Sequence, residues 1–310
     1  KKLSWHSKSY RGLKKLGSFT YPFLLLQQLK QYQPDIVIAA SDIPHIVWGA
    51  WCAKQLKVPF IADLYDNFEG FGQARIPGMK HLLRQAVCQA QLVTTTSQPL
   101  AELVIHDYAA QAKVVSLPST VDLVTFRSGN KSNAREKFGL LPNKQYIGTA
   151  GGLYKDKGVE VIYQAWEQMK HEMPNVHLVL AGPYQPDYPP PEEERVHYLG
   201  SLAHHEISTL FQALDLGIIS ILDTPFGRYC FPQKAYEMLA CDLPVVVANI
   251  GEMSYLFRDS PQVLFQTGNA NDLASKIQQQ LQSPQQQSIA VEDWATIIQR
   301  LEPMITALKF

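Results

Sequence analysis

The segment from Phe231 to Val247, FPQKAYEMLACDLPVVV, carries residue types that suit a phosphorylated, hydroxyl-rich ligand. Pro232 precedes a run of helix formers, and Pro244 opens an apolar β-branched run typical of a buried strand. The start of a helix offers free N–H groups and partial positive charge, which attract phosphate. Glu237, one turn further, could accept hydrogen bonds from ribose hydroxyls. A surface helix with a solvated glutamate explains these residues equally well.

A second candidate segment, residues 150–158, reads AGGLYKDKG and lies between an expected strand and an expected helix. Gly151 and Gly152 lack side chains, so the backbone there can approach a ligand closely. Lys157, at the helix start, can neutralise a diphosphate. The alternative is an ordinary strand-to-helix turn with a solvated lysine.

Alternating strands and helices must position both segments, and this alternation predicts an α/β fold with parallel sheets. In the first half, strands are expected at 35–39, 58–62, 91–95 and 113–116, and helices at 44–56, 78–89 and 99–108. In the second half, strands are expected at 146–149, 176–181, 196–199, 216–221, 244–247 and 263–265, and helices at 158–173, 206–214, 233–241, 272–281 and 294–308. Residues 183–194 are too rich in proline for regular structure, and the glutamine-rich residues 278–287 are expected to run from a helix into a connector.

Composition excludes several classes of protein. The 310 residues suffice for two cores of ordinary domain size. A formal net charge of +0 provides no global field that would recruit nucleic acid. The four cysteines have no CxxC spacing and are interpreted as reduced thiols of a cytoplasmic protein. No apolar run approaches the ~20 residues of a membrane span, and the first residues do not read as a signal peptide.

Positive charge is concentrated near the start of the chain. The basic residues that precede Asp35, the first acidic one, are Lys1, Lys2, Lys8, Arg11, Lys14, Lys15 and Lys30. A solvated basic face is one explanation. The other is a surface that docks on anionic lipid, which would make the protein peripheral at the inner face of a membrane.

Motifs of several other enzyme classes are absent from the sequence. There is no GxSxG nucleophile elbow, no GxxxxGK[ST] phosphate loop and no GxGxxG followed by an acidic residue. Neither HExxH nor Asp-x-Asp occurs, and no cluster of histidines and carboxylates has metal-ligand spacing. The sequence therefore predicts no metal site.

The segment from Phe231 to Val247 resembles the donor-site signature of family 4 glycosyltransferases with the GT-B fold, P-x-K-x-x-E-x-M-A-x-G-x-P-V-V. Asp242 stands where that pattern has Gly, and Tyr229 stands where the family often has an earlier Glu. Residues 150–158 are similar to the family's G-R-L-x-x-x-K-G, with Gly152 in place of the Arg. Three residues could supply the missing charge, and the sequence leaves the choice among them open: Lys155, Arg228 and Lys234.

This resemblance covers nearly the whole chain and implies the GT-B architecture, two Rossmann-like domains with parallel sheets that face each other across a cleft. It places an acceptor-side domain in residues 1–122, a donor-binding domain in 123–291, and a C-terminal helix in 292–310 that packs back towards the first domain. Residues 117–122 resemble the family's P-N-G-V-D crossover between the domains. The family's opening strand and Gly-rich loop have no counterpart, so the first domain is expected to lack its first ~60 residues.

The function that the resemblance implies is a hexosyltransferase-type reaction. A sugar would pass with retention from a nucleotide-diphosphate sugar to an acceptor hydroxyl on a glycan, lipid or small molecule, without metal ion or cofactor. Lys157 and Glu237 are the expected catalytic residues. The expected donor-binding residues lie in the motifs and at strand ends: Gly151, Gly152, Lys157, Gly200, Ser201, Leu202, Pro232, Lys234 and Glu237.

Candidates on the acceptor side come from residues 63–69, which follow an expected strand, where ligands of parallel sheets collect. Tyr65 takes the place of the family's His and Asp66 keeps an acid, although simple loop solvation is the alternative. Gly152, Tyr229 and Tyr65 all depart from the family pattern. A catalytically weak or inactive nucleotide-sugar-binding module therefore stays open as a second interpretation, and a GT-B sugar-nucleotide epimerase as a third.

Overall fold

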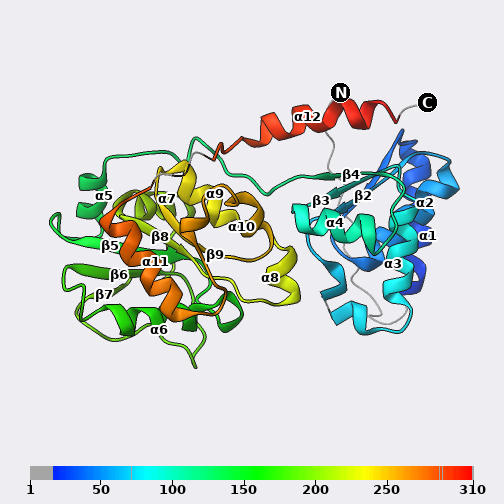
Figure 1. Cartoon of the computed structure of the whole chain (residues 1–310). Coiled ribbons are helices and arrows are strands. Elements are labelled where there is room, and N and C mark those ends of the chain that lie inside the picture. The colour runs from blue at the N-terminus through cyan, green and yellow to red at the C-terminus, as the bar shows by residue number, and fades with distance from the viewer. Residues whose placement is uncertain (1–16, 71, 286, 288, 309–310) are drawn as a thin grey trace. The chain divides into compact units, whose positions relative to one another are not determined.

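The computed structural model describes residues 17–70, 72–285, 287 and 289–308. Contacts group the chain into two compact units (Figure 1). The first comprises Lys1–Thr94, Val104–Val115 and Pro303–Phe310, and the second comprises Thr95–Leu103 and Ser116–Glu302. Each unit contains its own sheet, so the α/β class expected from the sequence is confirmed. The basic residues up to Lys15 lie outside the described residues, and lipid docking stays a prediction.

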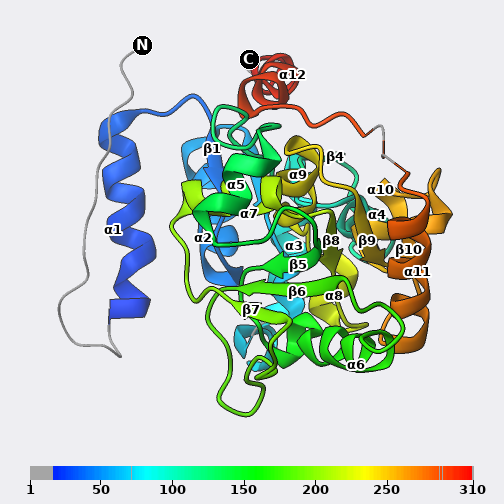
Figure 2. The same ribbon diagram turned by 90° about the vertical axis from the view of Figure 1, so that its left-hand side faces the viewer.

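A four-stranded sheet, in the order β1-β2-β3-β4, forms the centre of the first unit. Its strands are β1 (Val37–Ala39), β2 (Phe60–Leu64), β3 (Leu92–Thr95) and β4 (Lys113–Ser116). The helices between them are α2 (Ile43–Leu56), α3 (Met79–Cys88) and α4 (Gln98–His106), with 3-10 turns η1 (Phe68–Gly70) and η2 (Gly72–Arg75). Helix α1 (Gly17–Tyr32) lies beside α2 (Figure 2), because Tyr21 and Phe23 make ring contacts with Trp48 and Trp51.

A six-stranded parallel sheet, in the order β10-β9-β8-β5-β6-β7, forms the second unit. Its strands are β5 (Gln145–Ala150), β6 (Val176–Ala181), β7 (Val196–Tyr198), β8 (Leu216–Ile219), β9 (Val245–Ala248) and β10 (Leu264–Phe265). Its α-helices are α5 (Lys131–Lys137), α6 (Val159–Met169), α7 (His204–Ala213), α8 (Pro225–Tyr229), α9 (Gln233–Ala240), α10 (Gly251–Leu256) and α11 (Ala270–Gln282). The 3-10 turns are η3 (Lys155–Lys157) and η4 (Pro261–Val263), and α12 (Trp294–Thr306) closes the chain.

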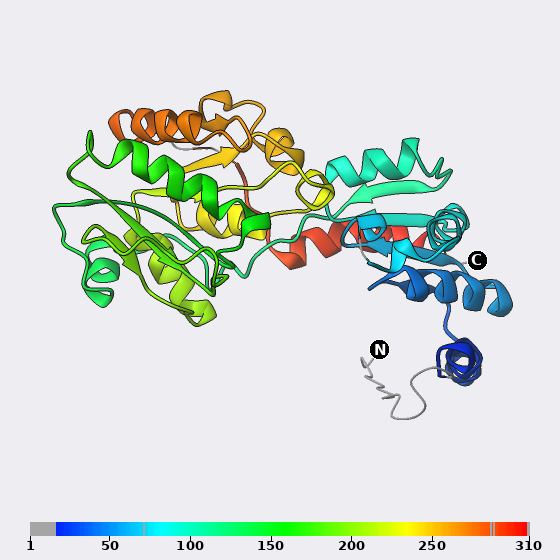
Figure 3. The same ribbon diagram turned by 90° about the horizontal axis from the view of Figure 1, so that it is seen from below.

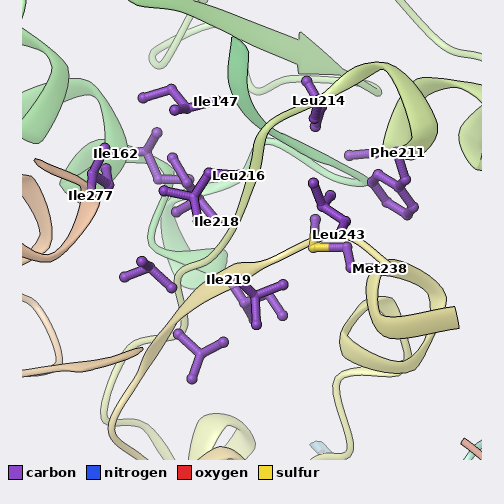
Figure 4. Packing of buried hydrophobic residues seen from close by; sticks show 14 of the residues in the cluster. Ile147, Ile162, Phe211, Leu214, Leu216, Ile218, Ile219, Met238, Leu243 and Ile277 are labelled. Atoms are coloured by element: carbon purple, nitrogen blue, oxygen red, sulfur yellow. The ribbon is translucent and has the colours of Figure 1, made fainter. Parts of the chain in front are cut away.

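The core of the second unit lies on both faces of its sheet. Every residue of β6, β8 and β9 is buried. Helix α11 packs beside α6, and α7 contacts both α5 and α9, so a helical layer covers each face (Figure 3). Figure 4 shows Ile147 and Ile218 of the strands beside Ile162 and Ile277 of α6 and α11, while Phe211 and Met238 of α7 and α9 pack on the other side with Leu214 and Leu243. Burial on both faces explains the unbroken apolar runs of these strands in the sequence.

The strands expected from the sequence are present, and β4 and β6 have the expected bounds. Three short helices, α5, α8 and α10, were not expected. Two of them begin at side-chain caps, since Asn130 accepts a hydrogen bond from Asn133 N (3.0 Å) and Thr224 accepts one from Gly227 N (3.1 Å). Helices of five to seven residues are too short to show a helical period in the sequence.

The turn between α9 and β9 explains why the family pattern has glycine where this chain has Asp242. Asp242 is exposed and has a φ of 56°, in the left-handed region. Glycine adopts this region freely, whereas other residues pay a steric penalty that is smallest for Asn and Asp. Asp242 therefore preserves the turn at a modest conformational penalty, and the departure from the pattern is local.

Replacing Asp242 by a β-branched residue should destabilise the second unit. We expect Asp242→Val to lower the free energy of unfolding by about 1–2 kcal/mol, because a branched side chain is disfavoured at positive φ, and Asp242→Asn to change it little. Chemical denaturation measures both. Asp259→Val is the matched control, since Asp259 is exposed and its φ is not in the left-handed region. Equal effects of the two valine substitutions would contradict the strain argument.

Candidate functional site

Glycines follow the carboxyl ends of the three adjacent strands β5, β6 and β7, and backbone hydrogen bonds connect these ends. Gly151 N donates a hydrogen bond to the Ala181 carbonyl at 2.9 Å, and Gly182 N donates one to the Gly200 carbonyl at 2.7 Å. A Cβ on Gly182 would lie 2.0 Å from the Gly151 carbonyl oxygen, which no side chain could tolerate. Gly151, Gly182 and Gly200 also have positive φ angles, of 114°, 124° and 68°. This edge of the sheet is consequently bare backbone, which leaves room for a ligand.

Gly152 continues this bare stretch, with the ring of Tyr154 beside it. A Cβ on Gly152 would lie 2.6 Å from that ring. The aromatic ring thus occupies the space into which a side chain at position 152 would project. No charged group reaches the site from this position.

Lys157 lies at the end of the 3-10 turn η3, and its ammonium lies 3.5 Å from the centre of the Phe226 ring. A cation over an aromatic face is stabilised without a counter-ion. Among the described residues, Lys157 has no acidic partner within ion-pair distance. The next residue, Gly158, fixes the turn against the end of β8, because its carbonyl accepts a hydrogen bond from Ser220 Oγ at 2.9 Å.

Lys234 reaches the same glycine turn from helix α9. Its Nζ lies 3.5 Å from Thr149 Oγ1 and 3.4 Å from the place that a Cβ on Gly151 would occupy. Burial lowers the pKa of Lys234 to about 8, the Glu237 carboxylate acts in the opposite direction, and the like charge of Lys157 adds to the lowering. Lysine loses charge when buried because the charged form loses its hydration.

Glu237 lies one turn further along α9 and is half-buried. Burial raises the pKa of the Glu237 carboxyl, and the positive charges of His204 and Lys234 oppose this rise. Within the described part of the chain, its carboxylate accepts no hydrogen bond. A half-buried carboxylate without a hydrogen-bond donor is available to hydroxyl donors of a ligand.

Pro232 is the N-cap residue of α9, and no side chain caps the first turn of this helix. The expected donor-binding residues Gly200, Ser201 and Leu202 lie in different surroundings. Gly200 joins the glycine edge, Ser201 is exposed, and Leu202 packs partly against the hydrophobic core. The structure thus brings Gly151, Lys157, Lys234 and Glu237 of the predicted donor-binding residues around one strand end, while Leu202 faces the core.

The acceptor-side candidates, Tyr65 and Asp66, belong to the first unit and follow β2. The Tyr65 hydroxyl donates a hydrogen bond to the Ser41 carbonyl at 2.8 Å, and its ring packs on Phe68 while remaining half exposed. Asp66 Oδ1 accepts a hydrogen bond from Asn67 N at 2.7 Å. Nearby, Asp42 caps α2 by accepting a hydrogen bond from His45 N. Both candidates therefore have local structural contacts, and their acceptor role stays a prediction.

Thr149, Tyr154, His204 and Phe226 surround the predicted residues but were not singled out from the sequence. Thr149 has a signal in the sequence, because it is a polar residue at the end of the predicted strand 146–149, and the structure leaves it only 3% exposed. The other three are aromatic or imidazole side chains in loops and helix starts, where the sequence offers no signal. Their positions depend on tertiary packing.

Other parts of the second unit are separate from this site. Asp215 pairs with Arg135 (2.6 Å) and Lys131 (2.9 Å), which agrees with a structural role. A cavity of about 630 Å³ beyond the ends of β9 and β10 includes none of the expected donor-binding residues. Arg228, a candidate for the missing charge, is part of its lining, which is Asp223, Arg228, Asn249, Ile250, Leu264, Gln266, Thr267, Asp272 and Lys276. The described residues contain no group of three or more His, Cys, Asp or Glu residues that could hold a metal ion.

No helix among the described residues has the length and apolar character needed to cross a membrane.

Two family models match the chain. Residues 6–124 match the model "Glycosyltransferase Family 4", and residues 144–283 match "Glycosyl transferases group 1".

Curated relatives carry glycosyltransferase names. The chain is 23% identical over 270 residues to the alpha-monoglucosyldiacylglycerol synthase of Streptococcus pneumoniae, which covers 81% of this chain and 58% of the relative. It is 26% identical over 189 residues to the D-inositol 3-phosphate glycosyltransferase of Mycobacterium tuberculosis, with 57% and 38% covered. The chain spans about half the length of the curated relatives it matches.

Solved structures share the fold. Anabaena Alr3699/HepE in complex with UDP superposes with a TM-score of 0.78 at 21% identity, over 95% of this chain and 84% of that one. Sucrose-phosphate synthase from Thermosynechococcus elongatus gives a TM-score of 0.71 at 18% identity, over 97% and 80%. Together, the two family models, these relatives and the two parallel-sheet units show that the chain belongs to the family 4-type glycosyltransferases with the GT-B fold.

Proposed function

We propose that this chain transfers a sugar from a nucleotide-diphosphate sugar to an acceptor hydroxyl, with retention and without a metal ion. The observation that carries the proposal is the bare glycine edge of Gly151, Gly182 and Gly200, with the Lys234 ammonium beside Gly151 and the charges of Lys157 and Glu237 close enough to act on that ammonium. A backbone edge suits a diphosphate, a cation suits its charge, and a carboxylate suits ribose hydroxyls.

A UDP-sugar is the donor that the neighbours favour. Structures of Anabaena Alr3699/HepE contain UDP, UDP with glucose, and UDP-glucose. At 21–23% identity these structures support the fold alone, so the nucleobase and the sugar of this chain's donor remain part of the proposal.

In the proposed reaction, the bond between the anomeric carbon and the diphosphate oxygen breaks, and a bond to the acceptor oxygen forms on the same face of the sugar. The acceptor hydroxyl gives its proton to the leaving phosphate, so atoms and charge balance. Negative charge grows on the diphosphate as its bond breaks. Lys157 and the N–H groups at the start of α9 would stabilise that growing charge, which is the kind of fixed donor that accelerates transfer.

The experiment that tests the function measures release of nucleoside diphosphate. UDP-glucose and other sugar nucleotides are incubated with the protein in EDTA, with and without glycan, lipid or small-molecule acceptors. We expect release that increases with acceptor, and NMR of the product should show the donor's anomeric configuration. Activity that EDTA abolishes and Mg²⁺ or Mn²⁺ restores contradicts the metal-independent part, and donor binding without release indicates a binding module.

Removing the carboxylate of Glu237 should weaken donor binding. We expect Glu237→Ala to reduce the affinity for the nucleotide sugar by about 1–3 kcal/mol, the magnitude of a lost charge-assisted hydrogen bond. Calorimetry measures the affinity. Glu136→Ala is the control, because Glu136 is an exposed glutamate on α5. Unchanged affinity in Glu237→Ala would leave Glu237 as an ordinary surface acid.

Replacing Lys157 should reduce the rate more than donor binding. We expect Lys157→Ala to reduce turnover by ~10²-fold or more, because charge on the diphosphate is greatest in the transition state. Lys155→Ala should change turnover little, since Lys155 is exposed and its ammonium lies 5.5 Å from the Tyr188 ring centre. Steady-state kinetics separate the effect on turnover from the effect on donor binding. A silent Lys157 and a sensitive Lys155 would show that the roles are assigned to the wrong lysine.

A further inference from the structure

The glycine turn after β5 supplies too little positive charge for a diphosphate. A nucleoside diphosphate carries at least two negative charges at neutral pH, and Lys157 supplies one positive charge. A side chain at position 152 could supply a second positive charge, but this residue is glycine, and the Tyr154 ring fills the adjacent space. A second cation therefore has to come from another element.

Two of the three candidates for the second cation, Lys155 and Arg228, make contacts elsewhere. The Lys155 ammonium lies over the Tyr188 ring, in the proline-rich loop. Arg228 is paired with Asp223, and both side chains are more than half exposed. Neither side chain comes within 4 Å of the place that a Cβ on Gly151 would occupy.

Lys234 is directed at the turn itself. Its Nζ lies 3.4 Å from the place where a Cβ on Gly151 would stand, so glycine at this position leaves the ammonium beside bare backbone. Its polar contact there is Thr149 Oγ1, at 3.5 Å, which is longer than an ordinary hydrogen bond. No acidic group among the described residues lies within ion-pair distance of Lys234. The Lys234 residue is half-buried, and its ammonium is therefore available to a counter-ion.

We propose that the Lys234 ammonium is the second cation of the diphosphate subsite and reaches it from α9 instead of from the turn after β5. This inference rests on the proposed function, and it assigns to Lys234 a role that the sequence left open among three residues. Lys157 and Lys234 would then hold the diphosphate from two sides of the Gly151 turn.

The position of Lys234 couples donor binding to protonation. Burial holds the pKa of Lys234 at about 8 in the free protein, and the charged groups that act on it are Glu237, on its own helix, and Lys157, on η3. His204, on α7, acts on Glu237. A bound diphosphate is an opposite charge, so it raises the pKa of Lys234 again. Affinity is therefore complete below pH ~8, and it falls as the pH rises above this value, because binding must then take up a proton.

Calorimetry with UDP as the probe tests this coupling. UDP is titrated into the full chain at about pH 8.5, where its phosphates are fully ionised, in Tris and in EPPS, two buffers with different heats of ionisation. A difference between the observed heats measures proton uptake. We expect uptake in the unchanged protein, and none in Lys234→Met, which keeps the length of the side chain and removes its charge.

A conservative variant that keeps the positive charge should retain the affinity for UDP but lose the proton uptake. We expect Lys234→Met to weaken UDP binding by ~10-fold or more near pH 7, as for the loss of one charge-assisted contact. Lys234→Arg should keep most of the affinity but show no proton uptake, because arginine stays charged throughout this pH range. Lys155→Met is the matched lysine control and should resemble the unchanged protein. Thermal unfolding verifies that each variant is folded.

The outcomes distinguish the inference from the function on which it rests. UDP binding with equal affinity and equal proton uptake in Lys234→Met overturns the role of Lys234 and leaves the proposed function intact. Proton uptake that persists in Lys234→Arg assigns the titration to another group and also overturns it. A protein that binds none of UDP, GDP and ADP overturns the proposed function, and the inference with it.

Discussion

Close approach of backbone at the carboxyl edge of the second sheet is the constraint on which the rest of the site depends. The Gly151 carbonyl oxygen and Gly182 are so near each other that a single Cβ would close the gap to 2.0 Å. Both residues also need positive φ angles, which only glycine adopts without penalty. The chain can therefore turn out of β5 and β6 side by side only through glycine, and the edge that results has no side chains of its own.

Because the edge is bare, its charges must come from neighbouring elements. Lys157 comes from η3, which Ser220 anchors, and Lys234 and Glu237 come from one face of α9. Burial of the Lys234 ammonium, and to a smaller extent the like charge of Lys157, disfavours its charged form and lowers its pKa. Such an arrangement is unfavourable in the free protein but favourable once an anion supplies the missing counter-charge. Sites that bind phosphates commonly show local conflicts of this kind.

Departures from the family pattern differ in their physical consequences. Asp242 replaces a glycine at a φ of 56°, and the result is a local conformational penalty in an exposed turn. Gly152 replaces an arginine, and the result is a change in the charge that the turn can offer. The Tyr154 ring beside Gly152 means that restoring the arginine would also require that ring to move. Counting matches to a motif treats these two positions alike, although one concerns backbone geometry and the other electrostatics.

The sequence by itself determined the buried strands, the glycine turn and the signature helix. A strand buried on both faces leaves a largely apolar run, which is why the bounds of β6 could be read directly, whereas short capped helices such as α8 leave no periodic signal. Only the tertiary structure decided which cation reaches the glycine turn. The sequence placed Lys234 among the donor-binding residues but left the source of the missing charge open among Lys155, Arg228 and Lys234, because spacing along the chain does not say where the end of a long, flexible side chain lies. Packing directs Lys155 towards Tyr188, Arg228 towards Asp223 and Lys234 towards Thr149.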